Sequence, residues 1–111
     1  MIVQIKTKTD LSDFNYALNK AYQVACDFVQ CEDGGACNYD TCIIKVKIAV
    51  RLRELTSFRL LKLHDSNYDG YWMIDFPVSG NGDKRRKMVE VASNFLRRYG
   101  YESDVYRISV D

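Results

Sequence analysis

The feature that most constrains the fold is a run of alternating residues near the middle of the chain. From Ile44 to Leu52, every second residue is aliphatic. The residues between them are Lys45, Lys47, Ala49 and Arg51. A period of two places successive side chains on opposite faces of a β-strand. The run therefore predicts a long strand, Ile44–Leu52, with one apolar face and one basic face.

The far end of this run has a second interpretation. Ile44, Ile48, Leu52 and Leu55 also recur at helical steps, so the segment from Ala49 to Thr56 would suit a helix as well. β-branched side chains are enriched here, and such side chains favour a strand. We take the strand as the prediction and keep the helix as its alternative.

Two other segments show the period of an amphipathic helix. The first follows Asp10 or Ser12, either of which suits a helix cap, and the second begins at Asp83. The apolar stripe of the first contains Phe14, Ala17, Leu18, Ala21, Tyr22, Ala25, Phe28 and Val29. The stripe of the second contains Met88, Val91, Ala92, Phe95, Leu96 and Tyr99. Gly100 then suits a left-handed helix end.

The remaining apolar runs predict short strands. One is Ile2–Thr7, two form a hairpin from Phe58–His64 and Tyr71–Pro77, and the last is Val105–Val110. The order β-α-β-β-β-α-β predicts an α+β fold, a mostly antiparallel sheet of about five strands with both helices packed on one face. Residues 1–111 suffice for one core and form a single domain. The residues predicted on the open face are Lys45, Lys47, Arg51, Arg53, Arg59 and Lys62.

Charge is distributed unevenly along the chain. The net charge is +1, but Met1–Thr41 carries three Lys against six Asp and Glu, net −3, and Cys42–Asp111 carries thirteen Lys and Arg against nine acids, net +4. An anionic partner is therefore expected at the second part. The sequence shows neither a signal peptide nor a membrane-spanning run, so the predicted location is the cytoplasm, with no membrane partner.

The junction before the second helix suits an anion. Gly80, Asn81 and Gly82 break the chain, and Lys84, Arg85 and Arg86 follow in the first helical turn. Unpaired N–H groups and the positive end of a helix both favour negative charge there. The alternative is an ordinary turn and a solvated helix start.

The four cysteines are the candidate ligands for a metal site. Cys26, Cys31, Cys37 and Cys42 lack the tight paired spacing of a zinc site, so we predict no metal and no cofactor. Nothing in the sequence places an orienting group beside a pair of cysteine and His64, and the carboxylates show no paired arrangement. The protein is therefore predicted not to be an enzyme.

The aromatic residues near the hairpin have two interpretations. Tyr68, Tyr71 and Trp72 lie close to basic residues, and exposed rings in such a setting stack on nucleic-acid bases. Packing across strands is the alternative for the same residues.

Two polar segments resemble a family of small uncharacterised proteins from phages and mobile elements. The first is Glu32–Asp40, with an acidic residue, two glycines, a small residue and then Cys-Asn-aromatic-Asp; the second is Gly80–Met88, a Gly-x-Gly-x-basic helix start. The resemblance extends to Gly100-Tyr101 and a closing strand at Val105-Tyr106. It implies a phage-like origin, hence the host cytoplasm, and carries no established activity.

Both segments contribute groups that suit a nucleotide. Asn38, Tyr39 and Asp40 offer contacts to base or ribose edges, and the second segment offers amides and cations for phosphate. The predicted ligand-binding residues are Asn38, Tyr39, Asp40, Gly80, Asn81, Gly82, Lys84, Arg85 and Arg86. The function predicted is non-catalytic binding of a phosphate-bearing or signalling nucleotide by a phage accessory protein with an anti-defence role.

Two alternatives come from other classes of protein. One is an anti-CRISPR-like inhibitor that uses its basic helix to bind a host defence protein or a nucleic-acid machine, direct binding of nucleic acid being less favoured. The other is a structural module that forms a homo-oligomer, since a strand as regular as Ile44–Leu52 would pair with its copy if it lay at an edge.

Overall fold

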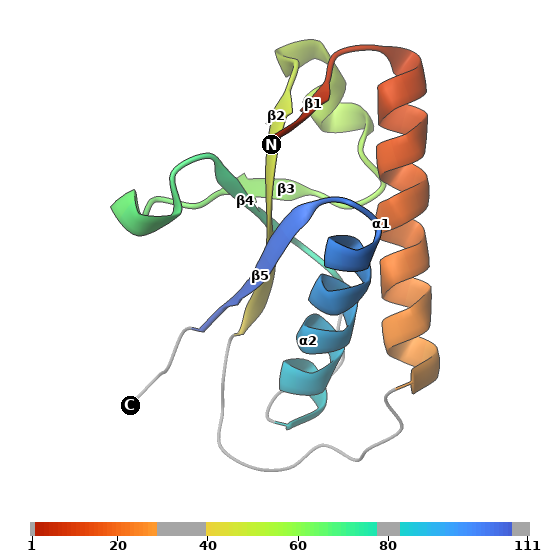
Figure 1. Cartoon of the computed structure of the whole chain (residues 1–111), viewed down its shortest axis with the longest axis vertical. Coiled ribbons are helices and arrows are strands. Elements are labelled where there is room, and N and C mark those ends of the chain that lie inside the picture. The colour runs from red at the N-terminus through yellow and green to blue at the C-terminus, as the bar shows by residue number, and fades with distance from the viewer. Residues whose placement is uncertain (1, 29–39, 78–82, 108–111) are drawn as a thin grey trace.

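The fold is α+β, and the element order is the predicted one (Figure 1). The structure, a computed structural model, describes residues 2–28, 40–77 and 83–107. The strands are β1 (Val3–Ile5), β2 (Thr41–Ile48), β3 (Leu60–Lys62), β4 (Tyr71–Ile74) and β5 (Glu102–Tyr106). The helices are α1 (Lys8–Phe28) and α2 (Asp83–Arg98), with two 3₁₀ turns, η1 (Val50–Leu55) and η2 (Ser66–Tyr68).

Strand β2 is the centre of a mixed, mostly antiparallel sheet. Strands β4 and β5 both run antiparallel to it across Ile43–Lys45, so they occupy opposite edges of β2. Strand β1 runs parallel to Val46–Ile48 on the side opposite β4. Within the described part of the chain, the edge of Val46–Ile48 that faces the β3–β4 hairpin therefore has no strand beside it.

The core lies between the sheet and the two helices. The helices α1 and α2 pack side by side on one face of the sheet, as predicted (Figure 1). Phe14 and Leu18 of α1, Leu96 of α2 and Ile44 of β2 are fully buried there. No helix in residues 2–28 or 83–98 is long and apolar enough to cross a membrane.

Strand β2 ends at Ile48, so the predicted continuation to Leu52 was wrong. The chain turns into η1, as the helical alternative allowed. The last bond of this ladder joins the Ala49 amide to the Ile5 carbonyl at 3.0 Å, where β1 ends. Beyond that point β1 offers no further partner, and the Leu52 amide bonds to the Ala49 carbonyl at 2.9 Å instead. Leu52 is thereby turned into the core.

Helix α1 is capped by Thr7 and not by Asp10 or Ser12. The Thr7 hydroxyl accepts the Asp10 amide at 3.1 Å, and the Asp10 carboxylate accepts the amides of Lys6 and Thr7 at 3.0 and 3.1 Å. These reciprocal bonds form a capping box. The backbone bonds from Lys6 and Thr7 hold the pKa of Asp10 below its ordinary value.

Helix α2 ends at a left-handed glycine, as predicted. Gly100 has φ +102, its amide bonds to the Arg97 carbonyl at 3.2 Å, and the Tyr101 amide bonds to the Leu96 carbonyl at 3.0 Å. This is the Schellman arrangement. The apolar stripe of α2 differs slightly from the prediction, because Val89 and Ser93 are buried and Tyr99 is exposed.

Replacing Gly100 by alanine is expected to lower the free energy of unfolding by roughly 1–2 kcal/mol, because a left-handed backbone strains an L side chain. A Cβ at this position would meet no atom within 4 Å, so the cost is conformational and not steric. Urea denaturation measures the loss. Gly100→Asn is the control, since asparagine tolerates this conformation better; an equal loss in both variants would show that φ is not the cause.

Strand β5 begins at Glu102 rather than at Val105. The Ile108 and Val110 part of the predicted strand lies outside the described residues. Two backbone groups of β5 that face away from β2 bond to side chains: the Ser103 carbonyl accepts Arg97 Nη1 at 3.0 Å, and the Val105 amide donates to Asp104 Oδ1 at 2.8 Å. Such bonds reduce the tendency of an edge strand to pair with another chain.

Candidate functional site

The structure describes part of the predicted ligand-binding set. Asp40, Lys84, Arg85 and Arg86 are described, with Asp40 buried, Lys84 and Arg85 half-buried and Arg86 exposed. The predicted residues outside the described ranges are Asn38, Tyr39, Gly80, Asn81 and Gly82.

The two predicted segments meet at Asp40. Arg85 Nε donates to the Asp40 carbonyl at 2.9 Å, which joins the start of α2 to the start of β2. The Asp40 carboxylate is 6% exposed and accepts Arg107 Nη1 at 2.9 Å, and Arg107 Nη2 donates to Glu90 at 3.0 Å. The Glu90 hydrogen bond raises the pKa of Arg107. Opposite charges thus offset one another at this junction, and the ligand-binding role of its residues stays a prediction.

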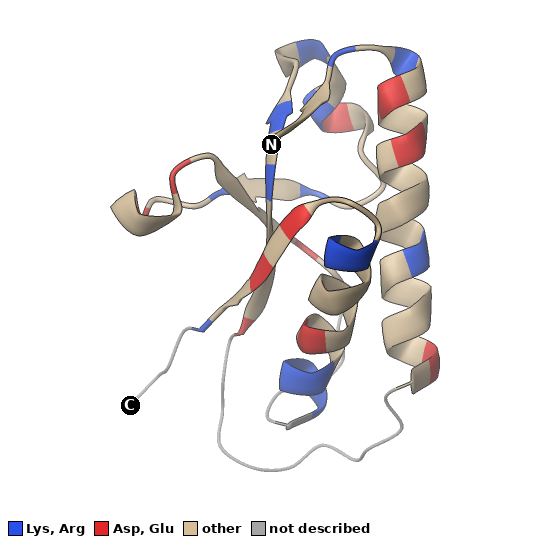
Figure 2. Cartoon of the chain, viewed as in Figure 1, with Lys and Arg blue, Asp and Glu red and all other residues tan. Residues whose placement is uncertain are grey.

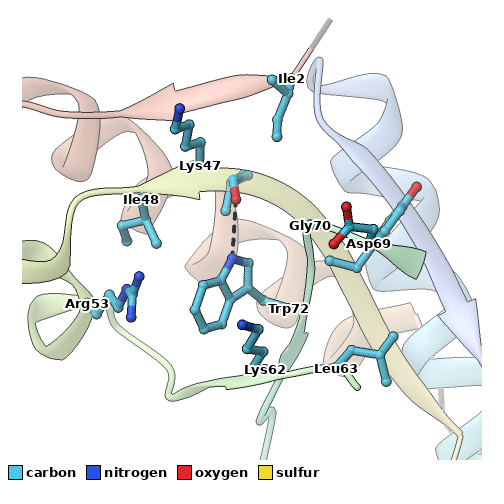
Figure 3. A pocket seen from close by; sticks show the side chains of 11 residues that line it. Ile2, Lys47, Ile48, Arg53, Lys62, Leu63, Asp69, Gly70 and Trp72 are labelled. Carbon is cyan, nitrogen blue, oxygen red and sulfur yellow. Dashed lines mark hydrogen bonds between the residues drawn. The ribbon is translucent and has the colours of Figure 1, made fainter. Parts of the chain in front are cut away.

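A second candidate lies where the β3–β4 hairpin diverges from β2. A cleft of about 400 Å³ opens beside the strand-free edge of Val46–Ile48 (Figure 3). Lys47 of β2, Arg53 of η1 and Lys62 of β3 line it, so we call it the cationic cleft. A volume of this size falls within the range of small-molecule sites.

Trp72 occupies the middle of the cationic cleft (Figure 3). Its indole Nε1 donates to the Val46 carbonyl at 3.2 Å, which satisfies part of the edge that lacks a strand. The Arg53 guanidinium carbon lies 5.0 Å from the indole ring centroid. A cation at this distance from an indole face is attracted by the ring. Trp72 therefore holds the Arg53 guanidinium at the cleft.

Charge in the cleft is asymmetric. Figure 2 shows basic residues along β2, η1 and β3. Asp69 is the single carboxylate among the lining residues that the structure describes, beside Gly70 at the entry to β4. These four charged side chains are exposed, and three cations against one acid give the lining a net positive charge, which favours anions.

The tyrosines near the hairpin pack mainly against one another. The Tyr68 ring makes edge contacts with Tyr71 at 5.6 Å and with Tyr106 at 5.4 Å, measured between centroids. The Tyr106 hydroxyl donates to Asp65 at 2.8 Å, and this bond raises the pKa of Tyr106. These contacts agree with the packing interpretation, whereas Trp72 is the aromatic residue in the middle of the cleft.

The two described cysteines, Cys26 and Cys42, are free thiols in different settings. Cys42 is buried, with its Sγ 3.6 Å from the Ser103 hydroxyl, and burial raises the pKa of its thiol to about 12. Cys26 is exposed on α1, while Cys31 and Cys37 lie outside the described residues. Within residues 2–28, 40–77 and 83–107, no three His, Cys, Asp or Glu side chains converge to hold a metal ion.

The sequence identifies the basic and aromatic residues that line the cleft, but it does not predict that they lie together. The sequence predicts Lys47, Arg53 and Lys62 on an open sheet face, and it offers Trp72, with Tyr68 and Tyr71, as a ring near basic residues. What joins them is the turn at η1, which places Arg53 over the indole. The helical alternative for 49–56 was the one signal in the sequence that pointed to this arrangement.

Comparison with protein-family models, curated proteins and solved structures gives no match.

Proposed function

We propose that this chain is a non-catalytic binding protein for a phosphate-bearing nucleotide and that the cationic cleft holds the ligand. One observation carries the proposal: the Arg53 guanidinium rests 5.0 Å from the Trp72 ring in a cleft that Lys47 and Lys62 also line. The three cations come from three different elements; Figure 3 shows Arg53 and Lys62 near the Trp72 ring, and Lys47 extending from β2 away from it.

The chemistry of the cleft suits both parts of a nucleotide. A guanidinium offers paired N–H donors that match phosphate oxygens, and two lysines add positive charge. Ile48 and Leu63 supply apolar surface in the same cleft, which suits a base or sugar face. A ligand with an anionic end and a flat, partly apolar body fits these walls better than inorganic phosphate alone.

The biological setting we propose follows the resemblance to phage and mobile-element proteins. A small binding protein without catalytic groups acts by sequestering its ligand. A signalling nucleotide of a bacterial defence system would then be withheld from the host defence protein that it activates. The compartment for this role is the host cytoplasm.

Nucleotide binding is expected to raise the melting temperature. At ligand concentrations of about 100 times the dissociation constant, binding raises the free energy of unfolding by about 2.7 kcal/mol. For a chain of this size, that is a rise in melting temperature of roughly 10 °C. A panel of linear and cyclic nucleotides would be screened by thermal denaturation. Arg53→Gln should remove most of the shift, because it takes away the guanidinium that Trp72 positions.

Arg59→Gln is the matched control for that experiment. Arg59 pairs with Asp75 at 3.2 Å, is exposed, and does not line the cleft. Its loss should leave the ligand-induced shift intact. An equal loss of the shift in both variants, or no shift with any nucleotide, would refute the proposal.

A third variant tests whether the ligand binds at the other predicted site, the junction at Asp40, instead of in the cationic cleft. Arg85→Gln removes the hydrogen bond to the Asp40 carbonyl, which joins the two polar segments Glu32–Asp40 and Gly80–Met88. If the ligand binds at that junction, Arg85→Gln will reduce the thermal shift and Arg53→Gln will not. The protein would still bind a nucleotide, but outside the cleft.

The two alternative functions receive less support from the geometry. Arg85 and Arg97 of the basic helix bond to Asp40 and Ser103 within the chain, which reduces the charge offered to a nucleic-acid machine. Strand β2 has partners on both sides across Ile43–Lys45, so this part of it is not an edge that could pair with a copy.

A further inference from the structure

We infer that the ligand of the cationic cleft carries, at the end away from its phosphate, a pair of adjacent hydrogen-bond donors that Asp69 accepts. This inference rests on the proposed function and narrows it to nucleotides that carry such a donor pair. The donor pair is either the N1–H and amino group of guanine or the two hydroxyls of a ribose.

The lining of the cleft has Arg53 at one end and its one described carboxylate, Asp69, at the other, where the Lys45 side chain also packs against Gly70. In Figure 3, Arg53 and Asp69 lie on opposite sides of Trp72. Asp69 belongs to the turn before β4, where Gly70 adopts φ +84 and lies close to Lys45. Arg53 belongs to η1. The two side chains therefore belong to separate turns on either side of the indole.

This polarity fixes the direction of the ligand. An ionised carboxylate accepts hydrogen bonds and repels phosphate, so the phosphate is directed to the Arg53 side of Trp72. The two oxygens of one carboxylate can accept two neighbouring donors. Adenine presents a donor next to an acceptor on its pairing edge and fits such a group less well.

The test compares wild-type protein with Asp69→Asn by titration calorimetry, using guanosine diphosphate (GDP) and inorganic pyrophosphate as probes. We expect Asp69→Asn to weaken GDP binding about tenfold or more, the equivalent of one lost charge-assisted bond. Pyrophosphate has no donor pair, so its binding should stay equal or become tighter when the repelling carboxylate is removed. Asp27→Asn, on exposed α1 surface, is the control and should change neither affinity.

Two further probes, 2′-deoxy-GDP and adenosine diphosphate, show whether guanine or ribose supplies the donors. If guanine supplies them, GDP and 2′-deoxy-GDP bind alike and adenosine diphosphate binds about tenfold more weakly. If ribose supplies them, GDP and adenosine diphosphate bind alike and 2′-deoxy-GDP is the weak one. Equal affinity for all three probes overturns the inference.

Failure of the inference is distinct from failure of the proposed function. Suppose that GDP binds wild-type protein and Asp69→Asn with the same affinity, and that Arg53→Gln still abolishes binding. The cleft then holds a nucleotide, but Asp69 does not accept hydrogen bonds from it. If neither GDP nor pyrophosphate binds wild-type protein, both the donor-pair inference and the nucleotide proposal for these probes are refuted.

Discussion

Replacing Phe14 by alanine is expected to lower the free energy of unfolding by roughly 3–5 kcal/mol, the cost of deleting a fully buried aromatic side chain and leaving a cavity. Phe14 is completely buried on α1, and its ring centroid lies 5.7 Å from that of Tyr101, the residue that follows the Gly100 turn. The side chain therefore joins α1 to the connection between α2 and β5. Urea denaturation followed by circular dichroism measures the loss.

Tyr16→Ala is the matched control, because it removes an aromatic ring from the same helix two residues later. Tyr16 is 57% exposed and lies beside Tyr99, with 6.2 Å between the centroids of the two tilted rings. We expect a loss below about 1 kcal/mol, as for most exposed positions. Comparable losses at Phe14 and Tyr16 would mean that the core does not lie between α1 and the sheet as described.

Replacing Asp40 by alanine is expected to cost roughly 1–3 kcal/mol. The Asp40 carboxylate is almost entirely buried and receives a charge-assisted bond from Arg107 at 2.9 Å. Breaking a fully buried ion pair costs about 3–5 kcal/mol, but Arg107 is 58% exposed and keeps Glu90 as a partner, which lowers the expected value. Urea midpoints of the two proteins, with their slopes, give the difference.

Asp27→Ala serves as the comparison for Asp40, since Asp27 lies exposed near the end of α1. Its removal should change the free energy of unfolding by less than about 0.5 kcal/mol. A large loss at Asp40 alone assigns that carboxylate a structural role at the junction of α2 and β2. Unchanged stability of Asp40→Ala, together with loss of nucleotide binding, would instead favour the ligand-binding role predicted for Asp40 from the sequence.

Much of the fold could be predicted from periodicity. The stripes of α1 and α2 and the alternation at Ile44–Ile48 are set by which residues must be buried, and burial leaves a period in the sequence. The end of β2 could not be predicted in this way. It depends on β1 ending at Ile5, a partner distant in sequence, after which the backbone bonds within η1.

Caps and edges show the same limit on a smaller scale. Asp10 and Ser12 both have the chemistry of a helix cap, but the chain direction set by β1 gives that role to Thr7. The β5 edge is covered by Arg97 and Asp104, and the sequence alone gives no sign that these side chains turn toward the backbone.

The candidate site illustrates why local motifs are incomplete. The polar segments Glu32–Asp40 and Gly80–Met88 could be recognised in the sequence because their polar residues are consecutive. The cationic cleft is built from β2, η1, β3 and β4, and its central contact joins Arg53 to Trp72 across the chain. The pairing of β2 with β4 and the turn at η1 together bring these residues to one place.

The most direct test of the cleft is the fluorescence of Trp72, the only tryptophan in the chain. Titration of GDP into wild-type protein should give a saturable change in emission, since the indole lies in the cleft beside Arg53. In Arg53→Gln, the dissociation constant obtained from this titration should rise at least about tenfold, as expected for one lost charge-assisted contact. In Arg59→Gln, the dissociation constant should stay that of the wild type. Emission that stays constant while the same nucleotide raises the melting temperature would show that the ligand binds elsewhere and would contradict the account.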